Sequence, residues 1–413
     1  MPETSAASAS PTKPLRLFLI AGEHSGDALG AHLIEALRTL SPRPLELAGV
    51  GGELMAEQGL VSLFPLAELA LMSPLAILAR LPSLWRRLRE TVRATLAFQP
   101  EVLVILDSPE FTHQVAKRVR RRAPTIPIVD YVSPSVWAWR PWRARKMRRY
   151  IDQILAILPF EPDVHTRLGG PACNYVGHPM VEKLDWIGAL DVEPLRKRLG
   201  IPQDRSVLLV LPGSRASEVQ RLMAPFGEAV RALASQGEPF EVIMPVVESV
   251  RAPVEEGLRS WPVTPHLVTN EADKFCAFKL ATVALAASGT VTLELALAGT
   301  PMVVAYKVDA LAYSLRFLFL AHSVALPNLI LGKRVFPEFL HQDCNGEKLA
   351  GALAPLMHEG LERDAQLKGL AKVIELVRET GDSPSERAAR LVLSYANQAG
   401  ISAPRPQRAS IGM

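Results

Sequence analysis

The chain has 413 residues, of which 48% are hydrophobic and 21% charged, and its formal net charge at pH 7 is +4. This composition excludes a disordered chain, and the length predicts two domains of similar size. Cys173, Cys276 and Cys344 are far apart and form no CxxC pair, which argues against a zinc site or a disulfide framework and fits a reducing compartment. We expect loose tails at 1–14 and 399–413, the first of them without the features of a signal peptide.

Two glycine-rich turns follow apolar, strand-like segments in the first half of the chain. The turn at 22–27 carries Glu23, Ser25 and Asp27, and a second turn lies at 49–52. Neither turn has the spacing of a dinucleotide fingerprint, so NAD binding is disfavoured. Close packing of a helix on a strand explains the glycines about as well as a ligand site does. The polar side chains in the first turn favour the functional interpretation.

An acid follows the next apolar strand, predicted at 102–106. Asp107 would stand at the carboxyl end of a parallel strand, which is where open α/β sheets bind their ligands. Pro109, two residues later, is also compatible with Asp107 as the cap of the next helix. The sequence supports the two interpretations equally.

The region from Arg80 to Arg149 is strongly basic, with sixteen Lys or Arg against five Asp or Glu, and this excess predicts an anionic partner. The apolar segment 63–85 precedes a cluster of arginines and is interrupted by prolines. It is either a buried helix pair or, as we favour, a surface lying on a membrane. The segment 137–149 contains three Trp and six cations, which suit lipid headgroups, a phosphorylated lipid, a solvated helix face or, least well, single-stranded nucleic acid.

A second α/β unit follows the hinge-like segment 176–179. Its first strand, 206–211, leads into a Gly-Ser turn with Arg215, a combination suited to a pyrophosphate although it is not a Walker A loop. Asn328 follows a proline and either presents its amide to a ligand or forms a turn. No D-x-D pair occurs in the chain, so we expect no metal on a diphosphate.

A buried strand predicted at 283–286 leads into the segment 286–305, which continues with a turn, a helix at 291–298, a second turn and a buried strand at 302–306. Ser288, Gly289 and Thr290 form a small polar turn ahead of a helix, whose free backbone amides would make an anion site. Glu294 lies in the first turns of this helix. A capping box would need Ser or Thr at position 291, which is Val, so Glu294 has no local partner and a ligand hydroxyl is favoured.

Seven separated motifs in this order resemble the lipid-A-disaccharide synthase family. They are AGEHSGDALGAHLI, DSPEF, YVSPSVWAWR, VGHPM, LPGSRASEV, SGTVTLELALAGTPMVV and LPNLILGKRVFPEFL, and the resemblance extends from about Leu15 to Ala396. It implies the GT-B fold, an α/β architecture of two Rossmann-like, doubly wound domains facing a cleft. The domain bounds that we expect are a tail at 1–14, an acceptor domain at 15–185, a UDP-sugar domain at 186–385, a helix at 386–398 returning to the first domain, and a tail at 399–413.

The resemblance also implies a reaction, in which UDP-2,3-diacylglucosamine donates its sugar to the 6-hydroxyl of 2,3-diacylglucosamine 1-phosphate (lipid X). The anomeric centre is inverted, UDP is released, and neither a cofactor nor a metal takes part. The implied catalytic residues are Asp107 as general base, with Glu23 and Ser25. The implied UDP-sugar residues are Arg215, Ser288, Gly289, Thr290, Glu294 and Asn328. The family motif departs at His341, where we expect Gln, so neither His341 nor Gln342 is assigned a role.

The implied place of action is the cytoplasmic face of the inner membrane, with the protein bound peripherally and without a nucleic-acid partner. A two-domain chain with a returning helix could also exchange that helix in a homodimer. Two rival functions stay open. One is another GT-B enzyme that acts on a UDP-amino sugar, such as a 2-epimerase, and the other is a membrane-docked, non-catalytic binder of nucleotide sugars.

Overall fold

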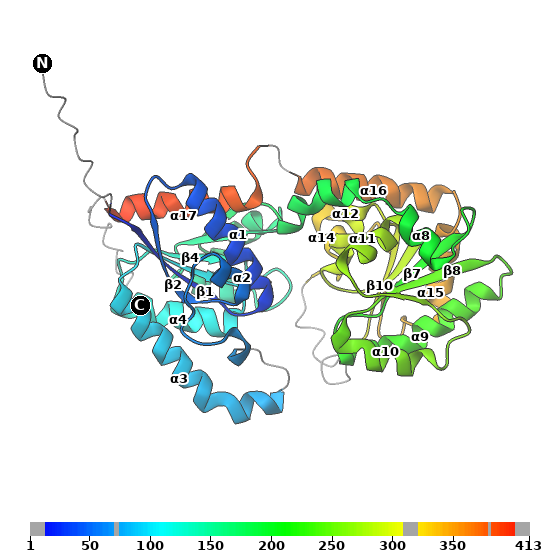
Figure 1. Cartoon of the computed structure of the whole chain (residues 1–413), viewed down its shortest axis with the longest axis horizontal. Helices are drawn as coiled ribbons and strands as arrows, with labels where there is room; N and C mark the ends of the chain where they lie inside the picture. Colours follow the sequence, from blue (N-terminus) through cyan, green and yellow to red (C-terminus); the bar gives the residue numbers. More distant parts are fainter. Residues whose placement is uncertain (1–12, 70–73, 309–320, 379–380, 401–413) are drawn as a thin grey trace, which may run out of the picture. The chain divides into compact units, whose positions relative to one another are not determined.

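The computed structural model describes residues 13–69, 74–308, 321–378 and 381–400, although not the side chains of 74–81 and 398–400. The described chain divides into two compact units (Figure 1). Unit 1 runs to Pro179 and resumes at Gly381. Unit 2 consists of the residues between these two parts and begins at Met180. The expected boundaries were 185 and 386.

Unit 1 is built on a parallel six-stranded sheet with the order β2-β1-β3-β4-β5-β6. Its strands are β1 (Leu15–Ala21), β2 (Leu45–Val50), β3 (Val102–Leu106), β4 (Ile128–Tyr131), β5 (Gln153–Ala156) and β6 (Ala172–Tyr175). Its helices are α1 (His24–Leu40), α2 (Glu53–Glu57), α3 (Pro74–Phe98), α4 (Pro109–Arg122), α5 (Trp142–Met147), α6 (Glu161–Leu168) and α17 (Pro384–Gly400). Strands β1, β3 and β4 are almost wholly buried, and β3 is entirely apolar, because helices cover both faces of the sheet.

Unit 2 repeats the arrangement with the order β12-β11-β10-β7-β8-β9, again all parallel. Its strands are β7 (Ser206–Leu211), β8 (Phe240–Pro245), β9 (His266–Val268), β10 (Val283–Ala287), β11 (Met302–Tyr306) and β12 (Glu338–Leu340). Its helices are α7 (Leu184–Ala189), α8 (Glu193–Leu199), α9 (Ala216–Ala234), α10 (Arg251–Leu258), α11 (Glu271–Leu280), α12 (Val291–Ala298), α14 (Leu326–Leu331), α15 (Gly346–Leu353) and α16 (Leu361–Val377). The fold class that the sequence predicts, two doubly wound α/β units, is confirmed.

The last described helix, α17, belongs to unit 1, where it lies along α1 (Figure 1). Ala388, Ala389, Val392 and Ala396 of this helix are part of the unit 1 core. Arg387 also donates from Nε to the carbonyl oxygen of Val176 at 2.7 Å. The chain therefore leaves unit 1, builds the whole of unit 2, and returns to complete the first core.

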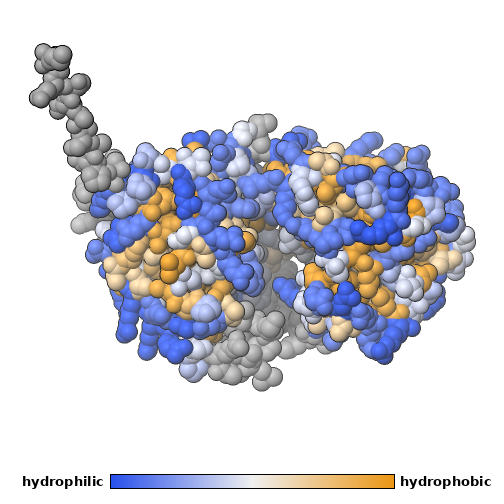
Figure 2. Space-filling view, in the orientation of Figure 1, coloured by the Kyte–Doolittle hydropathy of each residue, from blue (hydrophilic) through white to orange (hydrophobic). Residues whose placement is uncertain are grey.

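The described parts of the apolar segment 63–85, which exclude 70–73, do not form a helix pair. A single 3-10 turn at Leu66–Glu68 is followed by α3, which continues through Pro82 to Phe98. Within the described ranges, no helix has the length and apolar character needed to cross a membrane. On the face shown in Figure 2, each unit carries hydrophobic patches within a mainly hydrophilic surface.

Candidate functional site

Each sheet has one place where the chain reverses its direction of travel across the strands. In unit 1 the chain passes from β1 to β2 on one side and then from β3 to β6 on the other, so β1 and β3 flank the switch point. In unit 2 the corresponding neighbours are β7 and β10. Ligands of open α/β sheets bind beyond the carboxyl ends of such strand pairs. The two candidate half-sites therefore lie at the turns after these four strands.

The unit 1 switch point brings Ser25 and Asp107 together. The pairing of Ala21 with Leu106 aligns the ends of β1 and β3. Ser25 Oγ then donates a hydrogen bond to Asp107 Oδ2 at 2.7 Å, and Oδ1 of the same carboxylate accepts from the Ser108 backbone at 2.7 Å. Both side chains reach the surface, because Ser25 is exposed and Asp107 is half-buried. The arrangement offers an oriented carboxylate to a hydroxyl group that enters from solvent.

The backbone at this point is held in an unusual conformation. Asp107 and Ser108 have φ angles of +54° and +43°, and Ser108 rather than Asp107 occupies the cap position of α4, without a capping hydrogen bond from its side chain. A Cβ atom at Gly22 would lie 2.1 Å from the Cβ of Ser108, so only glycine fits there. Left-handed non-glycine residues are costly and are concentrated at functional sites. The structure does not support Asp107 as the cap of α4, and a ligand-binding role for Asp107 stays a prediction.

The turn at 22–27 is shorter than the sequence suggests because α1 begins at His24. Glu23 is the exposed residue before this helix and has an extended backbone. Asp27 is buried and accepts from three amides at the start of α2, those of Gly52, Leu54 and Met55, at 2.7–3.1 Å. Asp27 therefore joins α1 to α2, and its presence does not support a ligand site.

The unit 2 switch point carries two helix N-termini. The pairing of Leu211 with Ala286 aligns the ends of β7 and β10, after which α9 begins at Ala216 and α12 at Val291. Backbone amides in the first turn of a helix have no partner within the helix and favour an anion. Two such groups at neighbouring strand ends suit a ligand with two linked phosphates.

Arg215 stands at the first of these turns with its side chain 77% exposed. Its Nη1 donates to Glu218 Oε1 at 3.1 Å, while Glu218 Oε2 accepts from the Arg215 backbone at 3.3 Å. An exposed ion pair of this kind contributes about 0.2–1 kcal/mol, so the guanidinium can exchange Glu218 for an anionic ligand.

The second turn is formed by Ser288, Gly289 and Thr290. Ser288 Oγ donates to the carbonyl oxygen of Val324 at 2.7 Å, which commits its hydrogen to the protein. Gly289 is exposed, has a φ of +149°, and has no atom within 4 Å of the position of a Cβ. Thr290 is exposed and caps no amide with its side chain. The turn is therefore anchored at Ser288 and open at the other two positions.

Glu294 has a partner that comes from another helix. Its Oε2 lies 2.6 Å from Lys274 Nζ on α11, and the carboxylate is only 15% exposed. Lys274 in turn lies over the rings of Phe275 and Phe278, at 5.2 Å and 5.5 Å from their centroids. The local pattern correctly excluded a capping box and could not show this longer-range ion pair.

The amide of Asn328 is buried and bonded within the protein. Its Nδ2 donates to Phe336 O at 2.9 Å and to Glu338 Oε1 at 2.7 Å, and its Oδ1 accepts from the backbone of Val335 and Phe336 at 2.8 Å and 3.0 Å. These four bonds use the full capacity of the amide. Asn328 thus fixes the segment after α14 and does not present its amide to solvent.

Glu338 is a polar residue beside Asn328 that the sequence analysis did not single out. Besides Asn328, it accepts hydrogen bonds from Ser323 Oγ and from the backbone of Val324 at 3.2 Å. The segment from Ser323 to Ala325 is thereby held where Val324 meets Ser288. The signal that could have found it is an acid preceding the apolar pair Phe339-Leu340 in a short strand.

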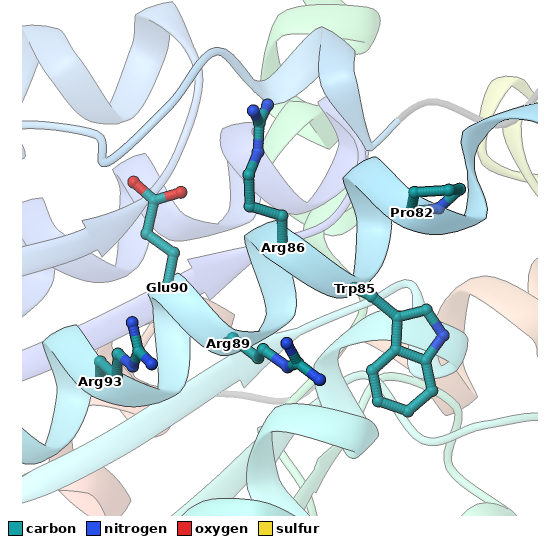
Figure 3. Close-up of a pocket in the computed structure, with 6 residues that line it drawn as sticks. All are labelled: Pro82, Trp85, Arg86, Arg89, Glu90 and Arg93. Atoms are coloured by element: carbon teal, nitrogen blue, oxygen red, sulfur yellow. The ribbon is translucent and has the colours of Figure 1, made fainter.

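A basic hollow lies on α3 in unit 1. It has a volume of about 780 Å³ and is lined by Pro82, Trp85, Arg86, Arg89, Glu90 and Arg93. Figure 3 shows Trp85, Arg89 and Arg93 along one row of the helix, and Arg86 and Glu90 along the next. Arg118 of α4 lies over the Trp85 ring, 5.1 Å from its centroid. The side chains of the preceding apolar positions, Leu75 among them, are outside the described residues.

The remaining predicted positions are less informative. Gln342 is exposed, and His341 has a φ of +53° with its backbone amide bonded to Tyr306 O at 3.0 Å. His178 is buried, and its burial lowers its pKa to about 4. In the part of the chain that the structure describes, no group of three or more His, Cys, Asp or Glu side chains is placed to hold a metal ion.

Comparison with known proteins identifies the family. The family described as lipid-A-disaccharide synthetase matches residues 17–392. A lipid-A-disaccharide synthase from Rhodopseudomonas palustris (strain HaA2) is 49% identical over 390 residues, which cover 94% of this chain and 98% of that protein.

Solved structures show the same fold at low identity. A glycosyltransferase from Rickettsia africae aligns with a TM-score of 0.57 and 10% identity, covering 94% of this chain and 100% of that chain. A UDP-GlcNAc 2-epimerase from Neisseria meningitidis bound to UDP-GlcNAc aligns with a TM-score of 0.58 and 11% identity, covering 93% of this chain and 100% of that chain. The chain therefore belongs to the lipid-A-disaccharide synthase family, whose members are glycosyltransferases, and it has the GT-B fold.

Proposed function

We propose that this chain transfers 2,3-diacylglucosamine from its UDP derivative to the 6-hydroxyl of 2,3-diacylglucosamine 1-phosphate. The products are a β-1,6-linked disaccharide 1-phosphate and UDP. The observation that carries the assignment of roles is the hydrogen bond from Ser25 Oγ to Asp107 Oδ2 at the unit 1 switch point. Family membership supplies the reaction, and this contact supplies the group that takes the proton.

Asp107 is the general base of the proposed reaction. Inversion at the anomeric carbon needs a single displacement, so no enzyme nucleophile is required. The acceptor hydroxyl gives its proton to the Asp107 carboxylate as its oxygen attacks. Ser25 and the Ser108 backbone amide hold the carboxylate in one orientation. A base within hydrogen-bond reach typically contributes about 10²–10⁴-fold to the rate. Glu23, exposed beside this pair, would bind the acceptor sugar.

Unit 2 is the proposed site for UDP. The amides at the starts of α9 and α12, together with Arg215, would meet the charge of the diphosphate, and an always-charged planar guanidinium suits that role. Gly289 and Thr290 would allow close approach of the phosphates. Glu294, held by Lys274, would accept from the ribose hydroxyls. Asn328 would act indirectly, by fixing the segment that supports Ser288.

The proposed place of action is the cytoplasmic face of a membrane, reached through α3. Its row of Trp85, Arg89 and Arg93 combines an aromatic ring with cations, as membrane-surface helices do. Each basic residue near an anionic lipid surface contributes about 1 kcal/mol. An R86S/R89S/R93S variant should float poorly with vesicles containing anionic phospholipid, whereas R231S/R251S/R259S in unit 2 should float like the wild type. Equal flotation of the two variants would refute this docking surface.

The decisive assay is UDP release from UDP-2,3-diacylglucosamine, with and without the monosaccharide 1-phosphate, in detergent and with EDTA. We expect release that requires the acceptor and survives EDTA. Asp107→Asn should lose about 10²–10⁴-fold in turnover while binding UDP normally, because asparagine can still accept from Ser108. Asp163→Asn, at an exposed position of α6, is the matched control.

Three outcomes would overturn parts of the proposal. Full turnover by Asp107→Asn removes Asp107 from the mechanism. Release without acceptor indicates a hydrolase, and conversion of the UDP-sugar to an epimer indicates a 2-epimerase. Binding of UDP-sugar without any turnover indicates a non-catalytic binder.

A further inference from the structure

The loop after β4 lies beside the proposed base. Strand β4 pairs with β3, and Leu106 is in register with Tyr131. The backbone amide of Asp107 donates to Tyr131 O at 3.2 Å. Residues 132–141, which contain the Trp-rich motif, therefore begin at the same sheet edge as Asp107. This loop is part of the unit 1 half-site.

The backbone of this loop is strained at both ends. Val132 has a φ of +83° and Arg140 a φ of +54°. A positive φ is a genuine outlier for a β-branched residue, and such a conformation persists only where surrounding contacts enforce it. The loop thus requires an external support.

Two side chains of α6, one turn apart, supply that support. Trp137 Nε1 donates to Glu161 Oε1 at 3.2 Å, and Glu161 Oε2 accepts from the Leu158 backbone at 3.1 Å. His165 Nε2 lies 2.8 Å from Ser133 Oγ. The Trp137 ring also packs edge-on against Phe160, with 5.4 Å between centroids.

Both supporting side chains are nearly inaccessible to solvent, with 2% exposure for Glu161 and 1% for His165. Burial raises the pKa of Glu161 to about 8 and lowers that of His165 to about 4. Buried polar pairs stabilise a fold little compared with apolar residues of the same size, and they fix geometry instead. The two pairs, Glu161 with Trp137 and His165 with Ser133, both connect α6 to the strained 132–141 loop. The geometry that they fix is therefore that of this loop.

We propose that Glu161 and His165 are positioning residues that hold the 132–141 loop in the conformation that binds the acceptor. The inference rests on the proposed function for its ligand, the sugar 1-phosphate. Neither residue touches that ligand. The loop would offer it the exposed Ser135 and the guanidinium of Arg140, which lies 4.0 Å from the centroid of the Trp139 ring. Loss of the support should weaken acceptor binding and leave UDP-sugar binding unchanged.

A double-mutant cycle of Glu161→Gln and Trp137→Phe tests the support. Backbone amides and the Trp137 indole donate to the two oxygens of the Glu161 carboxyl group. Glutamine has one acceptor oxygen, which the fixed backbone amides retain, so the bond that is lost is the one from Trp137. Each single variant should raise the KM for the acceptor about threefold to tenfold, the range expected for one hydrogen bond. The double variant should be no worse than the poorer single variant, because both changes remove the same contact. Trp261→Phe, which removes an indole bond to Met223 O in unit 2, is the matched control.

A spectroscopic measurement makes the result independent of turnover. With 5-fluorotryptophan in the chain, addition of the monosaccharide 1-phosphate should shift the ¹⁹F resonance of Trp137, assigned by its loss in Trp137→Phe. Glu161→Gln should move that resonance in the free protein and weaken its response to the acceptor. The resonance of Trp261 should stay in place throughout.

The outcomes separate the two proposals. Unchanged acceptor KM in folded Glu161→Gln, or full additivity in the cycle, would overturn the positioning role. A uniform fall in kcat with unchanged KM would also overturn it, because that result indicates a smaller folded fraction. Absence of acceptor-dependent turnover in the wild type would instead overturn the proposed function. The ¹⁹F titration would then decide the inference, and it fails if the acceptor leaves Trp137 unshifted.

Discussion

The stability of unit 1 should pass through a maximum near pH 6.5, and Glu161 should cause the decline on the alkaline side. Burial is the main reason that the pKa of Glu161 rises from 4.5 to about 8, and the charge of Asp130 acts in the same direction. Burial lowers the pKa of both His165 and His178 from 6.5 to about 4. Each of these groups therefore binds protons differently in the folded and unfolded chains.

The signs follow from which state holds more protons. Between pH 4.5 and 8 the folded chain keeps the Glu161 proton that the unfolded chain has lost, so stability falls as pH rises. One pKa unit corresponds to about 1.36 kcal/mol, which gives a loss of at most about 5 kcal/mol that is complete above pH 8. Below pH 6.5 the unfolded chain protonates two histidines that stay neutral in the fold. Each then removes up to about 3 kcal/mol by pH 4.

The slope of unit 1 stability against pH changes sign near pH 6.5, above which the histidines no longer contribute. Between pH 4.5 and 6.5 two histidine terms of about 1.36 kcal/mol per pH unit outweigh the one opposing term from Glu161. Above pH 6.5 only the Glu161 term acts. Glu161→Gln, which cannot ionise, should gain stability about twice as steeply between pH 4.5 and 6.5 and lose the decline between pH 6.5 and 8.

Urea unfolding from pH 4.5 to 9, followed by hydrogen exchange of peptides from each unit, measures this directly. Peptides from β4 and β5 report on unit 1, and peptides from β7 and β10 serve as the internal control. The hydrogen bond lost in Glu161→Gln lowers stability equally at every pH, so only the slopes are compared. An equal alkaline decline in the wild type and the variant would show that Glu161 ionises normally in the fold and would refute the reasoning.

Three further predictions concern residues that the structure joins to others. Asp27→Asn should lower the stability of unit 1 by about 1–3 kcal/mol in urea unfolding, while turnover per folded molecule stays within twofold, because Asp27 binds only backbone amides. Lys274→Met should weaken UDP binding about tenfold in calorimetry and leave the acceptor KM unchanged, since the partly buried Glu294 carboxylate loses its counter-ion. Asn328→Ala should destabilise unit 2 by about 2–4 kcal/mol, because two backbone amides lose their acceptor; a change in UDP affinity without loss of stability would contradict this account.

The central strands were predictable because strands buried on both faces consist of continuous apolar residues. Strands β3 and β10 are of this kind. The edge strands β6 and β12 were missed because they are short, partly exposed and contain polar residues. The turn predicted at 22–27 ends earlier, at the start of α1 at His24; Ser25 and Gly26 are typical of turns and poor helix formers, which explains the error.

The candidate site was predictable only where a rule of topology applied. Ser25 and Asp107 are 82 positions apart, yet both follow parallel strands, and the carboxyl ends of such strands meet at one sheet edge. No such rule gives Lys274 as the partner of Glu294, because their contact depends on how α11 packs against α12. Glu161 is hidden for a different reason. An acid in the first turn of a helix is usually an exposed, favourable residue, and only its burial reveals another role.

The turns near the two switch points place different residue types at positive φ angles, and the difference matches the chemistry proposed for each unit. The unit 2 turns have glycine at their positive φ angles, Gly213 at +115° and Gly289 at +149°. Glycine suits a site in which the backbone amides themselves meet a diphosphate, because no Cβ keeps the ligand away. The unit 1 turns place Asp107, Ser108 and Val132 in the left-handed region, although each pays for it in strain. A non-glycine residue in this conformation is useful where its side chain takes part in the chemistry, as Asp107 does in its proposed role as the base. The Glu161 and His165 contacts then supply the enforcement that strained residues need, which glycine turns in unit 2 do not require.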